Sequence, residues 1–239
     1  MRHNRGNEPR LVIVPPPILR YMKRQVRAAK RKGADFAHFP EGALSGYAGT
    51  DFETFEGFDW DTLRRATAEV LRCARETGIW VVVGSSHRLS DGHKPHNSLY
   101  VIDTAGQIVD RYDKRFCGGT PDGRSGDLAH YSPGDHSSVW VINGIRCGAL
   151  ICYDYRFPEL YRDYRRQGVE LVFHSFHAAN APAARIAAIG NAIGTEFTRV
   201  NKAATHTYPA ITMPAAMTAA AAANHVWISC PNSSAPQSL

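Results

Sequence analysis

A glutamate, a lysine and a cysteine each follow directly on a short apolar run in this 239-residue sequence. Glu41 ends the stretch FAHFPE, Lys114 follows Tyr-Asp, and Cys152 ends the stretch GALIC. Short apolar runs predict strands, and strand ends form the sheet edge where sites are built. These three groups are sufficient for acyl transfer, in which a thiolate attacks a carbonyl, a carboxylate moves protons and an ammonium holds the oxyanion.

Each of the three residues also has a plainer interpretation. Cys152 alone could be a buried core thiol, Lys114 a surface charge, and Glu41 a helix cap or an ion-pair partner. Other chemistries are poorly supported, because GALSG at residues 42–46 does not fit a G-x-S-x-G elbow and no phosphate-binding loop occurs. His174 and His177 lack a further ligand at helical spacing, so we expect no metal site there.

The elements that would position these residues alternate between strands and helices. Apolar runs predict strands at residues 36–39, 80–86, 98–102, 108–112, 139–142, 145–151, 169–173 and 225–229. Periodic patterns predict helices at about residues 19–32, 59–77, 158–167 and 214–224. A turn at residues 104–106 joins two of the strands as a hairpin, so we predict an α/β class with mixed sheets.

Composition and charge narrow the class of protein. Five cysteines without any C-x-x-C indicate reduced thiols, and no apolar run fits a signal peptide or a membrane span, so we expect a cytoplasmic protein without a membrane partner. The net charge of +6 has a local origin, since residues 20–32 carry seven basic side chains and no acid. Without interleaved aromatic residues we interpret this helix as a solvated face and predict no nucleic-acid binding.

Three ordered motifs together resemble the nitrilase, or carbon–nitrogen hydrolase, superfamily. They are FPEGALSGY around Glu41, YDKRF around Lys114 and GALICYDYRFPELYR around Cys152, in the Glu-Lys-Cys order of that family's catalytic triad. The resemblance extends from about residue 33 to residue 233. It implies an α/β fold with four αββα layers and mixed sheets, no cofactor, and pairing into homodimers or higher homo-oligomers.

The resemblance also implies a role for each residue. Glu41 would be the general base for Cys152, and Lys114 with the backbone N–H of Tyr153 would hold the oxyanion. Lys114 and the helix start at Pro158 would raise the thiolate fraction near neutral pH.

A second carboxylate is expected close to the lysine. Aligning Tyr131-Ser-Pro-Gly134 with the family's aromatic-Pro-Gly turn puts Asp127 where relatives carry an auxiliary Glu. Asp is shorter by one methylene, so either the loop moves inward or a water bridges the gap to Lys114. A solvated loop aspartate is the alternative interpretation.

The form CYDYRFPE looks most like the aliphatic amidase and Nit-like branches, which implies a thioester-forming hydrolase of a small, linear, non-peptide amide. An N-carbamoyl amide hydrolase and an inactive binding protein that retains the triad are the alternatives. Substrate size would be set by Tyr47, Tyr153, His174, Phe176 and the segment 178–213, which we expect to cover the site as a loop with a short helix near residues 185–193.

The two ends depart from the family pattern. Residues 1–18 include RLVIVPPPI, whose prolines cannot continue a central strand, and the C-terminus stops where the family adds another strand pair. We therefore expect residues 1–239 to form a single carbon–nitrogen hydrolase domain that is shortened at the C-terminus.

Overall fold

The computed structural model describes residues 16–177 and 208–232, with side chains in the last helix described from Met213 onward. The atypical residues 1–15, the segment 178–207 and its expected short helix near 185–193 lie outside the described residues.

Within the described residues, eight strands form two four-stranded sheets. The first has the order β1-β2-β3-β4 and the second the order β5-β6-β7-β8. The strands are β1 Phe36–His38, β2 Trp80–His87, β3 His96–Ile102, β4 Ile108–Asp113, β5 Val139–Ile142, β6 Ile145–Ile151, β7 Leu171–Ser175 and β8 Trp227–Ser229. Each sheet combines parallel and antiparallel pairs, which confirms the mixed sheets that the β3–β4 hairpin predicts.

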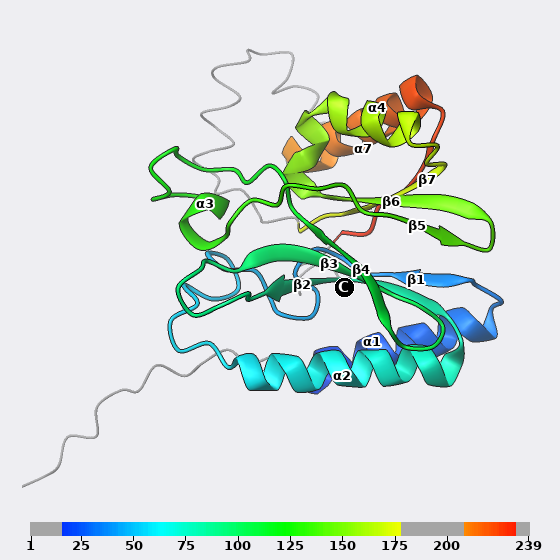
Figure 1. Ribbon diagram of the computed structural model, residues 1–239, viewed down its shortest axis with the longest axis horizontal. Coiled ribbons are helices and arrows are strands. Elements are labelled where there is room, and N and C mark those ends of the chain that lie inside the picture. The colour runs from blue at the N-terminus through cyan, green and yellow to red at the C-terminus, as the bar shows by residue number, and fades with distance from the viewer. Residues whose placement is uncertain (1–15, 178–207, 233–239) are drawn as a thin grey trace, which may run out of the picture.

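Helices cover the outer faces of the two sheets, so the molecule has four layers in the order αββα (Figure 1). The helices α1 Pro16–Arg31 and α2 Trp60–Thr77 lie on the first sheet, and α4 Pro158–Arg166 and α7 Tyr208–Asn224 lie on the second. Short helical segments, α3 Asp127–His130 and η1 Cys152–Arg156, lie near the strand ends. One apolar cluster fills the space under α1 and α2, and a second joins the two sheets and α4. The predicted α/β sandwich is confirmed.

Local sequence explains where the helices on the first sheet begin and end. Asp59 caps α2 by accepting a hydrogen bond from the Thr62 N–H at 2.8 Å, and Gly78 ends it in the left-handed conformation at φ 60°. The helix α1 begins with two prolines. Proline is tolerated there because the first N–H groups of a helix have no intrahelical acceptor, so its missing N–H costs no hydrogen bond. The sequence predicts that the basic face of α1 is solvated, but one of its side chains is not fully so. Lys23 pairs with Glu69 of α2 at 2.6 Å.

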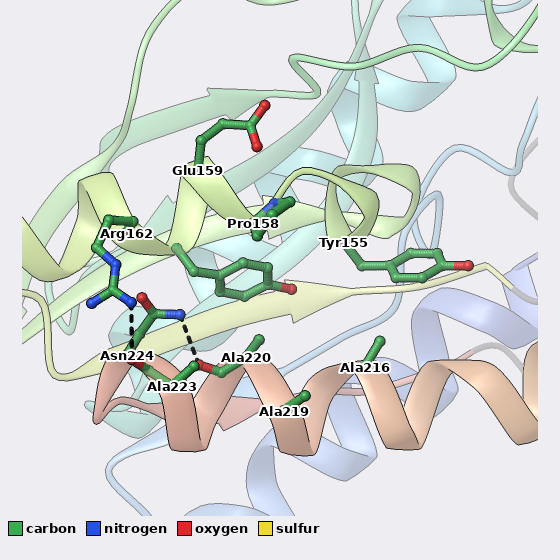
Figure 2. A pocket seen from close by; sticks show the side chains of 10 residues that line it. Tyr155, Pro158, Glu159, Arg162, Ala216, Ala219, Ala220, Ala223 and Asn224 are labelled. Carbon is green, nitrogen blue, oxygen red and sulfur yellow. Dashed lines mark hydrogen bonds between the residues drawn. The ribbon is translucent and has the colours of Figure 1, made fainter.

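The last helix begins earlier than its pattern predicts, at Tyr208 instead of about residue 214, and contains Pro214. Arg162 of α4 donates to the carbonyl of Ala223 at 3.1 Å, which ties the two outer helices together. A groove between them is lined by alanines of α7 and by Tyr155, Glu159 and Arg162 (Figure 2). Across residues 16–177 and 208–232, no helix is both long and apolar enough to cross a membrane.

The strand directions bring the chemically interesting residues to one region. The pairings make β1, β2 and β4 run one way within the first sheet, and β6, β7 and β8 are parallel in the second. Glu41 follows β1, Lys114 follows β4, and Cys152 follows β6. The carboxyl ends of these strands therefore supply all three residues.

Gly84 of β2 lets the loop that carries Glu41 pack directly on the first sheet. The Phe39 N–H donates to the Val82 carbonyl at 2.8 Å and the Leu44 N–H to the Gly84 carbonyl at 2.9 Å. A Cβ on Gly84 would lie 2.3 Å from the Pro40 oxygen and 2.7 Å from the Glu41 Cα. Both contacts are to backbone, so relief requires the loop itself to move.

We therefore expect Gly84→Ala to lower the free energy of unfolding by about 1–3 kcal/mol, the usual cost of overpacking. Chemical denaturation of both proteins at neutral pH measures the difference. The matched control is Gly92→Ala, since nothing lies within 4 Å of a Cβ built there. Equal stability of the two variants would contradict the close approach.

Candidate active site

The Glu41 carboxylate lies at the centre of the buried polar residues at these strand ends. Glu41 and Lys114 are each only 1 % exposed, and the ammonium Nζ lies 3.0 Å from Glu41 Oε1. The Asn97 side-chain amide donates to the same oxygen at 2.7 Å, and the His177 backbone N–H donates to Oε2 at 2.9 Å. Both carboxylate oxygens are therefore oriented by fixed donors.

The Lys114 ammonium also pairs with a second carboxylate. Asp127 Oδ2 lies 2.7 Å from Lys114 Nζ, and Asp127 accepts further hydrogen bonds from the Tyr47 hydroxyl and the Gly118 N–H. Burial alone would lower the pKa of Lys114, but Glu41, the Tyr47 phenol, the Cys152 thiol and Asp127 outweigh it and hold that pKa well above its ordinary value. The lysine is thus a permanent cation.

Asp127 reaches the lysine directly because its loop packs unusually close to the chain after Lys114. Gly119 and Gly126 form an isolated antiparallel bridge, and a Cβ on Gly119 would lie 2.1 Å from the Ser125 oxygen. Gly126 has a φ of 61° and opens the short helix α3, which begins with Asp127. Asp127 therefore contacts Lys114 directly, and no bridging water is needed.

Cys152 sits on a sharp turn between β6 and η1. Its φ of 40° is rare for a residue with a Cβ, and its thiol lies where the charges of Glu41, Lys114 and Asp127 act on it. Burial and then the negative charge of Glu41 raise the pKa of the thiol well above its ordinary value, although Lys114 lowers it. The predicted increase in thiolate near neutral pH is therefore wrong. Lys114 acts in the expected direction, but burial and Glu41 have larger effects.

The other residues expected at the site lie at different depths. Tyr47 lies beside Asp127 and stacks on the His177 ring at a centroid distance of 4.9 Å. Tyr153 directly follows Cys152, so its backbone N–H belongs to the turn that carries the thiol. His174 and Phe176 are fully buried and stack on each other at 4.4 Å. His174 Nε2 lies 3.2 Å from the Cys152 carbonyl, so this ring lies behind the nucleophile turn.

Sequence reasoning missed three groups that shape the site. Asn97 has no role in the sequence analysis, yet its carbonyl accepts from the Lys114 N–H at 2.8 Å and its side-chain amide donates to Glu41. His177 contributes its backbone N–H, which no sequence signal identifies. Asp154 was noted only as part of the family motif, but it is a fully buried carboxylate. No group of three potential metal ligands occurs among residues 16–177 and 208–232.

The buried His174 ring makes stability depend on pH. Burial lowers the pKa of His174 to about 3, whereas an unfolded histidine titrates near 6.5. Between these values the unfolded chain binds the extra proton, so the contribution of His174 to stability is lost as pH falls from about 6.5 towards 3.

We expect the stability advantage of the parent over His174→Gln to shrink by about 2 kcal/mol between pH 7 and pH 5, because one pKa unit corresponds to about 1.4 kcal/mol. Denaturant unfolding of both proteins at the two pH values provides the measurement. His93→Gln in an exposed loop is the control. A difference that stays constant with pH would show that the ring is protonated in the folded protein.

The comparisons with known proteins identify a family for this chain. The carbon–nitrogen hydrolase family model matches residues 15–235. A hydrolase encoded in the agr operon of Staphylococcus lugdunensis is 30% identical over 159 residues, which is 65% of this chain and 62% of that protein. The 2-oxoglutaramate amidase of Bacillus subtilis is 28% identical over 144 residues, which is 60% of this chain and 52% of that protein. The matched region thus spans less than two thirds of the length of either relative.

A solved structure shows the same fold at lower sequence identity. The amidase from Nesterenkonia sp. superposes with a TM-score of 0.68 at 20% identity, covering 93% of this chain and 72% of the other. A further structure of that amidase is described as a member of the nitrilase superfamily. The match of the family model over nearly the whole sequence, together with this fold, shows that the chain belongs to the carbon–nitrogen hydrolase family.

Proposed function

We propose that this protein hydrolyses a small, linear, non-peptide amide through a thioester on Cys152. The thiol sulfur attacks the amide carbonyl while Glu41 takes the thiol proton, and Glu41 then returns a proton to the departing nitrogen, so ammonia or an amine leaves. A water activated by Glu41 next attacks the thioester, which releases the carboxylic acid and restores the thiol. No external oxidant, reductant or cofactor is required.

The observation that carries this proposal is that Glu41, Lys114 and Cys152 meet at neighbouring strand ends, with Lys114 Nζ 3.0 Å from Glu41 Oε1. A thiol whose pKa is raised needs a base at the moment of attack, and Glu41 is the carboxylate whose charge acts most strongly on it. Donors from Asn97, Lys114 and the His177 backbone fix the carboxylate in place. This favours general-base catalysis over a preformed thiolate.

Lys114 is the proposed electrostatic stabiliser of the reaction. Its ammonium would face the oxygen of the tetrahedral intermediate together with the backbone N–H of Tyr153. Asp127 would act as the auxiliary carboxylate that holds the ammonium from its other side, at 2.7 Å. In a buried site such preoriented charges act at short range without first having to rearrange.

The substrate class rests on the relatives. The Bacillus subtilis relative is a 2-oxoglutaramate amidase, and a Xenopus tropicalis relative is an omega-amidase, which favours a primary amide at the end of a linear chain. N-carbamoyl cleavage is the second candidate, because a Solanum lycopersicum relative is an N-carbamoylputrescine amidase and the two reactions share their attacking and leaving steps. Assembly into a homodimer or larger homo-oligomer remains a prediction.

We expect Cys152→Ala to abolish ammonia release from a panel of linear amides and N-carbamoyl compounds, and to leave the melting temperature nearly unchanged. Intact-protein mass spectrometry of the parent should detect one added acyl group, and peptide mapping should locate it on Cys152. Turnover by the variant within tenfold of the parent would remove Cys152 from the mechanism. No turnover of any compound by a folded parent would favour an inactive binding protein.

Cys147→Ala is the matched control for that experiment. Cys147 is fully buried in β6, where its thiol lies 3.4 Å from the Ile145 carbonyl, and burial raises its pKa to about 11. We expect unchanged catalysis in this variant at equal folding.

We expect Asp127→Asn to lower kcat by tens to thousands of fold with little change in melting temperature, because an oriented charge near the reacting carbonyl contributes roughly 2–4 kcal/mol. Steady-state kinetics on the best amide of the panel measure the effect. Asp122→Asn, in the same loop but without a contact to Lys114 among the described residues, is the control. Unchanged kinetics in Asp127→Asn would leave Glu41, Lys114 and Cys152 as the complete set.

A further inference from the structure

Asp154 is a buried carboxylate at the junction of the two sheets that the mechanism above does not use. It is fully buried, lies two residues after Cys152 in η1, and accepts three hydrogen bonds. Its Oδ2 accepts from the Ile151 N–H at 2.9 Å and from the Tyr112 hydroxyl at 2.8 Å, and its Oδ1 accepts from the Phe116 N–H at 3.0 Å. Burying a carboxylate costs free energy, which these three hydrogen bonds must offset, so a function that requires the charge at this place would explain its presence.

The three donors come from two separate segments of the chain. The Ile151 N–H belongs to the last residue of β6, directly before the nucleophile. Tyr112 and Phe116 lie two residues before and two residues after Lys114. The Asp154 carboxylate is therefore hydrogen-bonded to the chain on both sides of the lysine. The Phe116 ring also stacks on Phe157 at a centroid distance of 3.6 Å, which adds an apolar contact between the same two segments.

The geometry points to Asp154 as a positioning residue that fixes the lysine-bearing end of β4 to the turn that carries Cys152. This inference rests on the proposed function, since it concerns the placement of that nucleophile relative to Lys114. Cys152 has an unfavourable positive φ, so its turn needs outside support to persist. Asp154 supplies that support through the N–H directly before the strained residue.

The Ile151 and Phe116 N–H groups can only donate and the Tyr112 hydroxyl donates as well, so an unprotonated carboxylate satisfies all three. Burial raises the pKa of Asp154 to about 6, but the Ile151 N–H, the Tyr112 hydroxyl, the Phe116 N–H and Lys114 oppose that increase. The carboxylate is therefore the main form at neutral pH. An Asn side chain must point its NH₂ group at either the Phe116 N–H or the Ile151 N–H. Either choice breaks the connection between the two segments while preserving the shape of the side chain.

A matched control lies in β4, next to the lysine. Asp113 is also a buried carboxylate, but it accepts from Ser98 at 2.5 Å and pairs with Arg111 at 2.9 Å, both within the first sheet. Asp113→Asn therefore removes a buried charge beside Lys114 without touching the Cys152 turn. It reports the structural cost of such a substitution alone.

The experiment compares Asp154→Asn with Asp113→Asn in the full chain. We expect Asp154→Asn to lower kcat at least thirtyfold with KM changed by less than threefold, and to slow alkylation of Cys152 by fluoroacetamide by tens of fold. Asp113→Asn should change kcat and the alkylation rate by less than threefold, even if its melting temperature falls as much as that of Asp154→Asn. Alkylation needs no amide turnover, so it tests the positioning role even if the proposed hydrolysis is wrong.

The proposal is overturned if the alkylation rate of Cys152 and the kcat of Asp154→Asn both stay within threefold of the parent. It is also overturned if Asp113→Asn loses as much of either rate as Asp154→Asn does. If Asp154→Asn does not fold, Asp154→Ser is the second variant, with the same expected split between kcat and KM. If neither folds, hydrogen exchange on the parent decides. The Phe116 amide, which lies in a loop, should exchange as slowly as the Ile151 amide in β6, and fast exchange at Phe116 would rule out the connection.

Discussion

A lysine ammonium buried between two carboxylates is the interaction on which the rest of the site depends. Lys114 is almost fully inaccessible to solvent, and a lone charge there would cost several kcal/mol. Glu41 and Asp127 offset that cost at 3.0 Å and 2.7 Å. The loops that carry both carboxylates are therefore held against the end of β4 by electrostatics as well as by packing.

The charge of Glu41 also affects the chemical state of the nucleophile. Burial is the largest cause of the raised pKa of the Cys152 thiol, and the negative charge of Glu41, which is held against the ammonium, raises that pKa further. A raised pKa favours the protonated thiol, so in the proposed mechanism Glu41 serves as its base. In the proposed mechanism the proton and the attacking electron pair move in the same step, and the buried site avoids holding two adjacent anions.

Close backbone approaches bring the loops within reach of the lysine. Gly84 allows the Glu41 loop to lie on β2, and Gly119 with Gly126 allows the Asp127 loop to lie on the chain after Lys114. A side chain at any of these glycines would meet backbone atoms closer than 3 Å. Asp154 performs the corresponding task between the sheets, since it connects the segment around Lys114 to the turn at Cys152.

The sequence by itself determined the α/β class, most element positions and the residues at the strand ends, and its family resemblance implied the four layers. Apolar periodicity located all eight strands and the longer helices, and motif order identified Glu41, Lys114 and Cys152, because these features depend on residues that are near neighbours in the chain. Only the tertiary structure decided that Asn97 and the His177 backbone orient Glu41, that Asp127 contacts Lys114 directly, and that burial raises the thiol pKa. Each of these depends on distances between segments far apart in sequence and on exclusion of water, and neither quantity is encoded in local pattern.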